Sequence, residues 1–227
     1  MRKVAYIPCK LNNDRVPGKN TKPFTNGLPL CQYVFNTLSI CVEKNILNEV
    51  YCFCSSPEIQ DYFPKNSQLK FLQRDKSLDQ STTLINEVTK SFINKIEADI
   101  YVMAHVTCPF IQEQTIKLAI DFIEYDNFDS ALPVKKIQNF LFDKNFKTLN
   151  FSTYSRPRTQ DLEPLFEPTS GFFAFNKNVA KSGREIGDNP KLIEVAPLEQ
   201  IDIDYPEDFE FANIVFNGLH TLQIKII

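Results

Sequence analysis

Glycine is scarce in this sequence. There are 6 glycines among 227 residues, and only Gly18 and Gly27 lie near the first polar loop. A Walker A loop and a dinucleotide fingerprint each need several glycines at fixed spacing directly after a strand. Neither motif is present here, so we expect neither a P-loop protein nor a nicotinamide-dependent enzyme.

Long apolar runs and an excess of charge of one sign are also missing. No apolar run approaches eighteen residues, and Met1-Arg2-Lys3 leads straight into a strand, so we expect no membrane span and no signal peptide. The formal net charge is -3, which gives no electrostatic reason to expect nucleic acid or an anionic membrane as partner. These absences favour a cytoplasmic protein.

The six cysteines lack the spacing of a zinc site. Cys52 and Cys54 form a C-x-C pair, but no second pair follows. Most of the cysteines lie inside apolar runs, which favours buried, reduced thiols. The other four are Cys9, Cys31, Cys41 and Cys108.

What the sequence does contain is a regular alternation of apolar strands and one-sided helices over roughly its first half. This alternation predicts an open, mostly parallel α/β sheet with helices on both faces. The expected strands are 4–7, 49–54, 69–72 and 100–104. The expected helices carry the stripes Leu30 to Cys41, Leu84 to Ile96 and Ile116 to Ile123, with a further helix start at 55–58.

The alternation stops near residue 130. After a strand at 130–134, the aromatic and polar stretch 140–155 suits a β-ribbon. Further strands are expected at 171–175, 192–195 and 201–203, and a helix at Pro206. We interpret residues 1–227 as a single domain with an inserted subregion at about 135–175.

The first loop is rich in cations. The strand Val4 to Ile7 is expected to end at Pro8, which has no N–H to donate. The loop after it carries Lys10, Arg15 and Lys19. Loops at the carboxyl edge of a parallel sheet are where α/β proteins bind phosphates. Surface lysines exposed to solvent are the competing interpretation.

Two aspartates near the C-terminus flank one isoleucine in the stretch IDID. On an extended backbone Asp202 and Asp204 would point to one face, where both carboxylates can reach one hard cation. The alternative is a solvated strand end, or a cap that Asp204 provides for the helix at Pro206.

Two of these segments resemble the acylneuraminate cytidylyltransferase (CMP-sialic acid synthetase) family. The family signature IPARGGSKRIPGKN lies over Ile7 to Asn20 without a gap, and its IDID-containing motif matches Ile201 to Phe209. Three departures occur in the first loop: Lys10 replaces an arginine, Leu11-Asn12 replaces a glycine pair, and Asp14 replaces a lysine. A lysine cannot reproduce the bidentate fork of an arginine.

The same resemblance extends to three shorter segments. His105 stands where the family has a glutamine that reaches the sugar, in a motif where Thr107 matches; a buried structural histidine is the alternative. The segment with Arg158 and Gln160 resembles the family's RRQDLP, and Ser170-Gly171 falls on its NGA motif, so these four residues are candidates for binding the sugar. The region of Arg74, Ser81 and Thr82 falls where the family contacts base and ribose.

The resemblance implies a Rossmann-like, three-layer nucleotide-diphospho-sugar transferase fold with a small β-rich dimerisation excursion, and a homodimer. It implies that CTP and a nonulosonic acid (sialic, pseudaminic or legionaminic) give a CMP-sugar and pyrophosphate for surface polysaccharide or glycan synthesis. A Kdo-type enzyme, or a catalytically silent sugar-nucleotide-binding protein, is the alternative.

The resemblance also assigns roles to individual residues. Mg²⁺ is expected on Asp202 and Asp204, and Lys10 and Lys19 are expected to stabilise the charge of the leaving pyrophosphate. The base that takes the proton of the sugar hydroxyl is hypothesised to be Asp204 or a metal-bound water. The nucleotide-binding candidates are Lys10, Arg15, Lys19, Asn20, Arg74, Ser81 and Thr82.

Overall fold

The computed structural model describes residues 1–13 and 16–221 and places eight strands in one sheet. The strand order is β3-β2-β1-β4-β7-β5-β6, and β8 pairs with β5. β1 to β4 pair in parallel, as do β5 and β8, whereas β7 runs antiparallel to both of its neighbours. The strands are β1 Lys3–Cys9, β2 Glu49–Cys54, β3 Leu69–Gln73, β4 Ile100–Ala104, β5 Ser130–Ile137, β6 Leu165–Pro168, β7 Phe172–Asn176 and β8 Pro190–Glu194.

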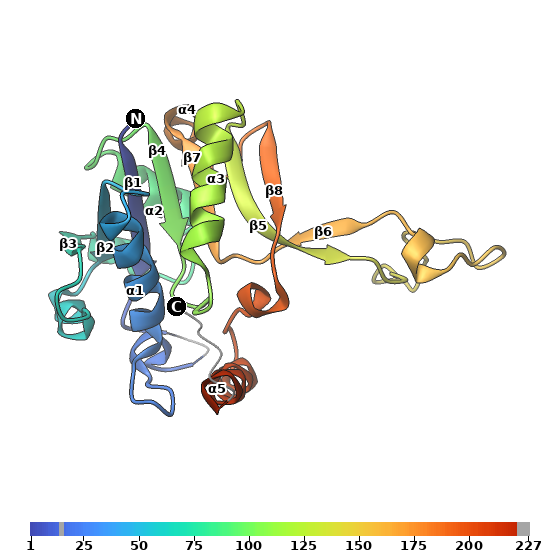
Figure 1. Cartoon of the computed structure of the whole chain (residues 1–227), viewed down its shortest axis with the longest axis horizontal. Coiled ribbons are helices and arrows are strands. Elements are labelled where there is room, and N and C mark those ends of the chain that lie inside the picture. The colour runs from blue at the N-terminus through green and yellow to red at the C-terminus, as the bar shows by residue number, and fades with distance from the viewer. Residues whose placement is uncertain (14–15, 222–227) are drawn as a thin grey trace.

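Helices cover both faces of this sheet, so the predicted α/β architecture is confirmed (Figure 1). Alternate residues of β1 point to opposite faces. Ile7 packs in the core beneath α1 and α3, and Tyr6 packs beneath α2 and α4, stacked on Phe92 with ring centroids 4.2 Å apart. The helices are α1 Leu30–Glu43, α2 Ile85–Ile93, α3 Glu113–Tyr125, α4 Lys177–Lys181 and α5 Pro206–Thr221.

Two local predictions about strands were wrong. The strand β1 continues through Pro8 to Cys9, because Pro8 pairs with Phe53 of β2 while the pairing with β4 already ends at Tyr6. The missing N–H of Pro8 therefore falls where that neighbour is absent. Residues 201–203 form no strand; the N–H of Ile203 donates to the carbonyl of Thr107 instead, at 2.9 Å.

An arm projects from the body between β5 and β6 (Figure 1). Its stem is the antiparallel pairing of 134–137 with 165–168, and residues 138–164 extend beyond it. We expected a β-ribbon at 140–155, but the structure has only an isolated bridge there, between Phe142 and Thr148. Between these two residues the chain makes a tight turn, in which the N–H of Phe146 donates to the carbonyl of Asp143 and Phe146 has a φ of 62°. The arm exposes the apolar side chains of Phe142, Phe146, Leu149 and Tyr154.

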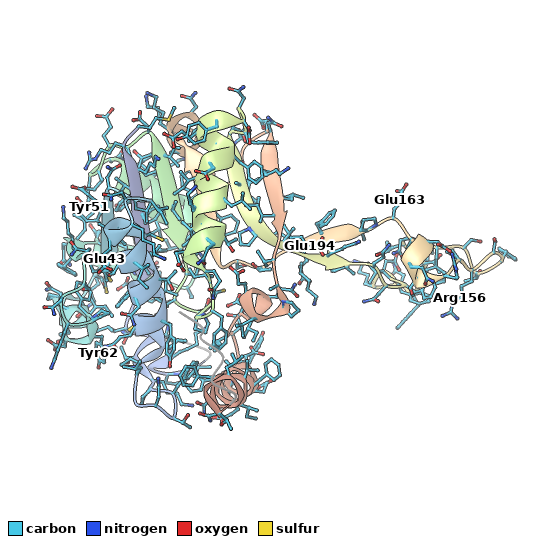
Figure 2. All side chains as sticks on the ribbon, viewed as in Figure 1. Glu43, Tyr51, Tyr62, Arg156, Glu163 and Glu194 are labelled. Atoms are coloured by element: carbon cyan, nitrogen blue, oxygen red, sulfur yellow. The ribbon has the colours of Figure 1, made fainter. Side chains whose placement is uncertain are left out.

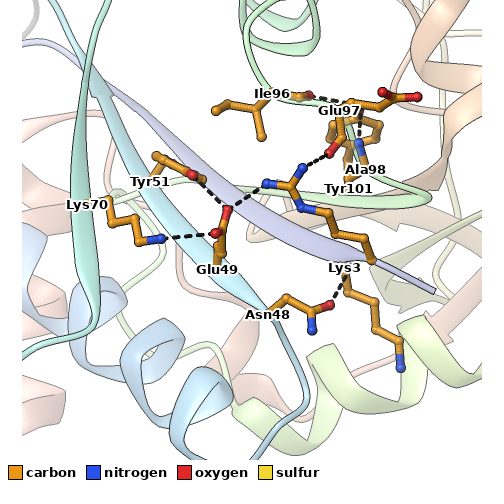
Figure 3. Close-up of polar contacts among 10 residues, drawn as sticks. Lys3, Asn48, Glu49, Tyr51, Lys70, Ile96, Glu97, Ala98 and Tyr101 are labelled. Carbon is orange, nitrogen blue, oxygen red and sulfur yellow. Dashed lines mark hydrogen bonds and ion pairs between the residues drawn. The ribbon is translucent and has the colours of Figure 1, made fainter.

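A polar cluster ties the strands together at the amino edge of the sheet. The carboxylate of Glu49 accepts hydrogen bonds from Tyr51 at 2.7 Å, Arg2 at 2.8 Å and Lys70 at 3.0 Å (Figure 3). Arg2 also donates to the carbonyl of Glu97 at 2.6 Å. The hydrogen bond from Tyr51, followed by that from Arg2, lowers the pKa of Glu49 to about 2. We call this set the Glu49 cluster.

None of the helices in the described residues is long and apolar enough to cross a membrane. All six cysteines are buried, free thiols, as expected from their apolar surroundings.

Candidate active site

A cavity of about 470 Å³ lies at the carboxyl edge of the sheet, opposite the Glu49 cluster. Its walls come from the loops that follow β1, β3 and β4, and from the segment before α5, because the carboxyl ends of parallel strands meet at one edge. The polar side chains that line it are Lys10, Asn13, Lys19, Arg74, Gln80, Ser81, Thr83, His105 and Asp204. We call it the main cavity.

Lys19 connects the first loop to the IDID segment. Its side chain is only 8% exposed, donates from Nζ to the carbonyl of Ile203, and lies 3.6 Å from Oδ1 of Asp204. The turn that presents it is fixed by Gly18 at a φ of 67° and by Asn20, whose Nδ2 donates to the carbonyl of Lys10 at 2.8 Å. Asn20 thus lies beneath the loop and supports it.

Arg74, on the loop after β3, is buried and also lines the main cavity. It is 4% exposed and forms an ion pair with Asp79, whose other oxygen accepts a hydrogen bond from Ser55. Its Nε has no hydrogen-bond partner among the described residues. The loop after β3 therefore presents a fixed guanidinium to the cavity.

Asp202 and Asp204 lie on an irregular segment that is held against the loop after β4. Ile203 between them is fully buried, and its N–H bonds to Thr107. Asp208, in the first turn of α5, accepts at Oδ2 the N–H groups of Asp204 at 2.9 Å and Tyr205 at 2.7 Å. These bonds tie the segment before α5 to the loop after β4 and to the first turn of the helix.

His105 lies at the end of β4 beside both aspartates. Its N–H donates to the carbonyl of Gly171 at 3.1 Å, while Nε2 is buried with no hydrogen-bond partner in the described part of the chain. Burial lowers the pKa of His105, and the charges of Asp202 and Asp204 oppose that shift. Gly171 is packed closely, since a Cβ there would lie 2.8 Å from Ile111 Cγ2.

A second cavity of about 210 Å³ also borders the IDID segment. Asp202 lines this cavity, whereas Asp204 lines the main one. Oδ1 of Asp202 is buried without a hydrogen-bond partner among residues 1–13 and 16–221. The residues that line this side cavity are Lys135, Glu167, Pro168, Thr169, Ser170, Gln200 and Asp202.

Many of the candidate residues converge on these two cavities. Lys10, Lys19, Arg74, Ser81, His105 and Asp204 line the main cavity, and Ser170 and Asp202 line the side cavity. Thr107 supports Ile203 from its backbone, and Thr82 lies between the lining residues Ser81 and Thr83. Arg15 lies outside the described residues.

Arg158 and Gln160 lie elsewhere. Both belong to the arm and line neither cavity; Figure 2 shows neighbouring Arg156 and Glu163 far from the body. The side chain of Arg158 is 72% exposed and forms two hydrogen bonds with Asp161, at 2.7 and 2.9 Å. Within one protomer the structure does not bring them to the site.

Several site residues were not anticipated from the sequence. Asp79 was not expected as the partner of Arg74, and Lys135 was not expected beside Asp202. Neither belongs to a motif, and only the folded chain brings them to these positions. The others are Asn13, Gln80, Thr83, Glu167, Thr169 and Gln200.

Sequence comparison finds relatives over most of this chain. It is 21% identical over 218 residues to the N-acylneuraminate cytidylyltransferase of Streptococcus agalactiae serotype III (strain NEM316), and 24% identical over 218 residues to N-acylneuraminate cytidylyltransferase A of Danio rerio. Each alignment covers 92% of this chain, but only 52% and 49% of those proteins. The chain therefore spans about half the length of the curated relatives it matches.

Structure comparison finds the same fold. CMP:2-keto-3-deoxy-manno-octonic acid synthetase complexed with CTP superposes with a TM-score of 0.68 at 16% identity, covering 96% of this chain and 99% of that one. The 4-diphosphocytidyl-2C-methyl-D-erythritol synthase of Anaerococcus prevotii DSM 20548 gives 0.66 at 12% identity, covering 95% and 96%. Residues 4–217 match the family described as cytidylyltransferase, and the chain belongs to that family.

Proposed function

We propose that this protein transfers the cytidylyl group of CTP to a sugar acid, giving a CMP-sugar and pyrophosphate. One observation carries the proposal: in a chain of the cytidylyltransferase family, buried Lys19 lies beside Asp204, and both residues line the main cavity. A buried lysine with an aspartate beside it suits a triphosphate that brings negative charge and a metal ion.

We assign a magnesium ion to the two aspartates: they line different cavities, but both carboxylates lie close enough to His105 to act on its pKa. Asp202 and Asp204 offer hard carboxylate oxygens, and Oδ1 of Asp202 is buried without a hydrogen-bond partner within the described chain. No group of three or more potential ligands occurs among the described residues. Two carboxylates suffice, because Mg²⁺ usually keeps several waters and takes further oxygens from substrate phosphates. When bound, the ion would neutralise charge on the triphosphate.

The side chains around the main cavity have distinct proposed tasks. Lys10 and Lys19 bind the phosphates and stabilise the charge that develops on pyrophosphate as it leaves. Arg74, held by Asp79, and Ser81 lie at the wall assigned to the nucleoside. The anomeric hydroxyl of the acceptor attacks the α-phosphorus in line with the leaving group, and Asp204 accepts its proton.

The acceptor is proposed to be a nonulosonic acid, with Kdo as the alternative. The relatives from S. agalactiae and D. rerio are named for N-acylneuraminate, which supports the first choice. A CMP:2-keto-3-deoxy-manno-octonic acid synthetase has the same fold, which keeps the second open. His105, which lines the main cavity and lies near Asp202 and Asp204, is proposed to contact the acceptor.

We also propose that the protein is a homodimer formed through the arm. Phe146 is 87% exposed and Tyr154 fully exposed, and aromatic side chains are enriched at protein interfaces. In a dimer Arg158 and Gln160 would reach the partner's cavity. Sedimentation velocity should therefore give a dimer that dissociates in a Phe146→Ser, Tyr154→Ser variant; a monomeric wild type would contradict this proposal.

The experiment for the activity is pyrophosphate release from CTP and Mg²⁺ with sialic, pseudaminic and legionaminic acids and Kdo offered one at a time. We expect release with one acid and its loss in Asp202→Ala. CTP binding without release from any acid would instead favour a silent sugar-nucleotide-binding protein. Failure to bind CTP would contradict the assignment of the main cavity.

A further inference from the structure

We propose that Lys135 binds the carboxylate of the acceptor in the side cavity, from the same protomer that supplies Asp202. This assignment rests on the proposed function, because it names the part of the sugar acid that one further residue recognises. Lys135 belongs to no motif of the sequence and lies on β5, far along the chain from Asp202.

The charges around the side cavity point to this lysine. Lys135 is the one cation among the described residues that line the side cavity. The hydroxyl groups of Thr169 and Ser170 and the amide of Gln200 line the same cavity. This set suits a ligand that carries one negative charge and several hydroxyl groups. Sugar acids have this composition, whereas CTP has far too much negative charge for a cavity with two carboxylates and one lysine.

Several other cations of the site and of the arm already have partners. Lys19 bonds to the carbonyl of Ile203 and lies beside Asp204, and Arg74 is paired with Asp79. On the arm, Arg158 is paired with Asp161, and Arg156 lies over the ring of Phe140 at 4.3 Å. Each would have to give up an existing contact to bind a carboxylate.

Lys135 is held much more weakly. Its side chain is 51% exposed, and Nζ lies 4.0 Å from Oε2 of Glu167, the residue opposite it on β6. An exposed pair at that distance contributes little free energy, so a substrate carboxylate can replace it. The backbone at Lys135 is nevertheless held in place, because the preceding residue, Val134, pairs with both β6 and β8.

The chemistry of the acceptor requires its carboxylate to lie near the reacting oxygen. In a 2-keto sugar acid the anomeric carbon carries both the hydroxyl that attacks CTP and the carboxylate. The hydroxyl must approach the main cavity, where Asp204 lies, so the carboxylate must lie within a few bonds of it. The side cavity begins at Asp202, two residues away on the same segment.

Backbone strain marks the same place. Ser170 has a φ of 60°, a conformation that non-glycine residues adopt rarely and at a cost in free energy. It precedes Gly171, whose carbonyl accepts the N–H of His105. The strained turn therefore holds a hydroxyl group at the side cavity and supports His105 at once, which suits hydroxyl recognition next to the carboxylate.

The test compares Lys135→Ala with the adjacent Lys136→Ala. Lys136 is also exposed, but successive side chains of a strand leave opposite faces, so it serves as a matched control. With the acid that the wild type uses, Lys135→Ala should raise KM for the acid about 10–100-fold, as expected for one charge-assisted hydrogen bond. KM for CTP should change less than about twofold in both variants.

A second measurement isolates the carboxylate. The wild type should use the sugar acid far better than its methyl ester, and Lys135→Ala should lose most of that preference. An unchanged KM for the acid, or an unchanged preference, in a Lys135→Ala variant that binds CTP normally would overturn the assignment alone. Absence of turnover by the wild type with every acid would overturn the proposed function, and this assignment with it.

Discussion

The two edges of the parallel part of the sheet treat their polar groups in opposite ways. At the amino edge, Glu49 receives three donors, and Tyr101 both accepts the N–H of Ala98 and donates to the carbonyl of Ile96. At the carboxyl edge, polar atoms of Arg74, His105 and Asp202 are buried without hydrogen-bond partners within the described residues. Strands β1 and β4 each run from the amino edge to the carboxyl edge, so the two environments lie at opposite ends of the same strands.

We interpret this difference as a division between groups that stabilise the fold and groups to which the proposed function assigns a ligand. Buried polar atoms in native proteins normally have partners, so unpaired ones need an explanation. Of the six such atoms in the described parts of the chain, four belong to the carboxyl edge: Asn20 Oδ1, Arg74 Nε, His105 Nε2 and Asp202 Oδ1. Under the proposed function, substrate and metal ion would satisfy atoms there, whereas the carboxylate of Glu49 at the amino edge already has three donors.

The largest effect is expected at the carboxyl edge, in Lys19→Met. Methionine keeps the length and most of the packing of the buried side chain but removes its charge. The rate of pyrophosphate release should fall about 10²–10³-fold, because a group that stabilises developing charge is lost. Urea unfolding should show a change in stability of no more than about 1 kcal/mol.

The control for this variant is Lys22→Met. Lys22 lies near Lys19 in sequence, is exposed, and contacts Glu210 at 3.7 Å and the ring of Phe209. It lines neither cavity, so its variant should keep nearly the full rate. A Lys19→Met enzyme with a rate near that of the wild type would show that the first loop is not a phosphate site.

The opposite result is expected at the amino edge, in Glu49→Gln. The neutral amide cannot satisfy Arg2 and Lys70, so the free energy of unfolding should fall by about 1–3 kcal/mol, with the rate unchanged. Urea titration measures the first quantity and pyrophosphate release the second. Glu43→Gln at the exposed end of α1 is the control, and it should change neither (Figure 2).

The pH dependence of stability should change in the same variant. The pKa of Glu49 is lowered from 4.5 to about 2 in the folded protein, so its ionised form stabilises the fold above pH 4.5. That contribution should decrease as the pH falls from about 4.5 towards 2. The wild type should therefore lose more stability than Glu49→Gln over this interval, and parallel curves would contradict the role of the cluster.

The sequence predicted the elements whose signal is local. The strands at 49–54 and 100–104 and the buried stripe of α3 follow from periodicity, and their bounds agree with the structure. The path of 201–203 did not follow, because it depends on the carbonyl of Thr107, nearly a hundred residues earlier. The amino-acid sequence alone cannot distinguish an extended segment without a neighbouring strand from a true β-strand.

The site shows the same division. Lys19 and Asp204 belong to motifs, so the sequence named both, and the fold brings them together across 185 residues of chain. Asp79 and Lys135 gain their meaning only from neighbours in space, Arg74 in one case and the side cavity in the other. The arm shows the same limit. Its strands pair at the stem, 134–137 with 165–168, and not in the aromatic stretch 140–155 from which a β-ribbon was predicted.

The smallest effects should come from two residues at opposite ends of β4, and they sharpen the comparison most. His105→Gln replaces an imidazole whose buried Nε2 has no hydrogen-bond partner among the described residues by the amide that the similar family has at this position. Stability should stay within about 0.5 kcal/mol of the wild type, while KM for the acid should change up to about tenfold. Tyr101→Phe removes a hydroxyl group that has two hydrogen-bond partners. It should lower the free energy of unfolding by about 1 kcal/mol and leave KM for CTP and KM for the acid unchanged. A loss of more than about 2 kcal/mol in His105→Gln would instead identify His105 as a structural residue of the core, and the carboxyl edge would then contain one group that stabilises the fold.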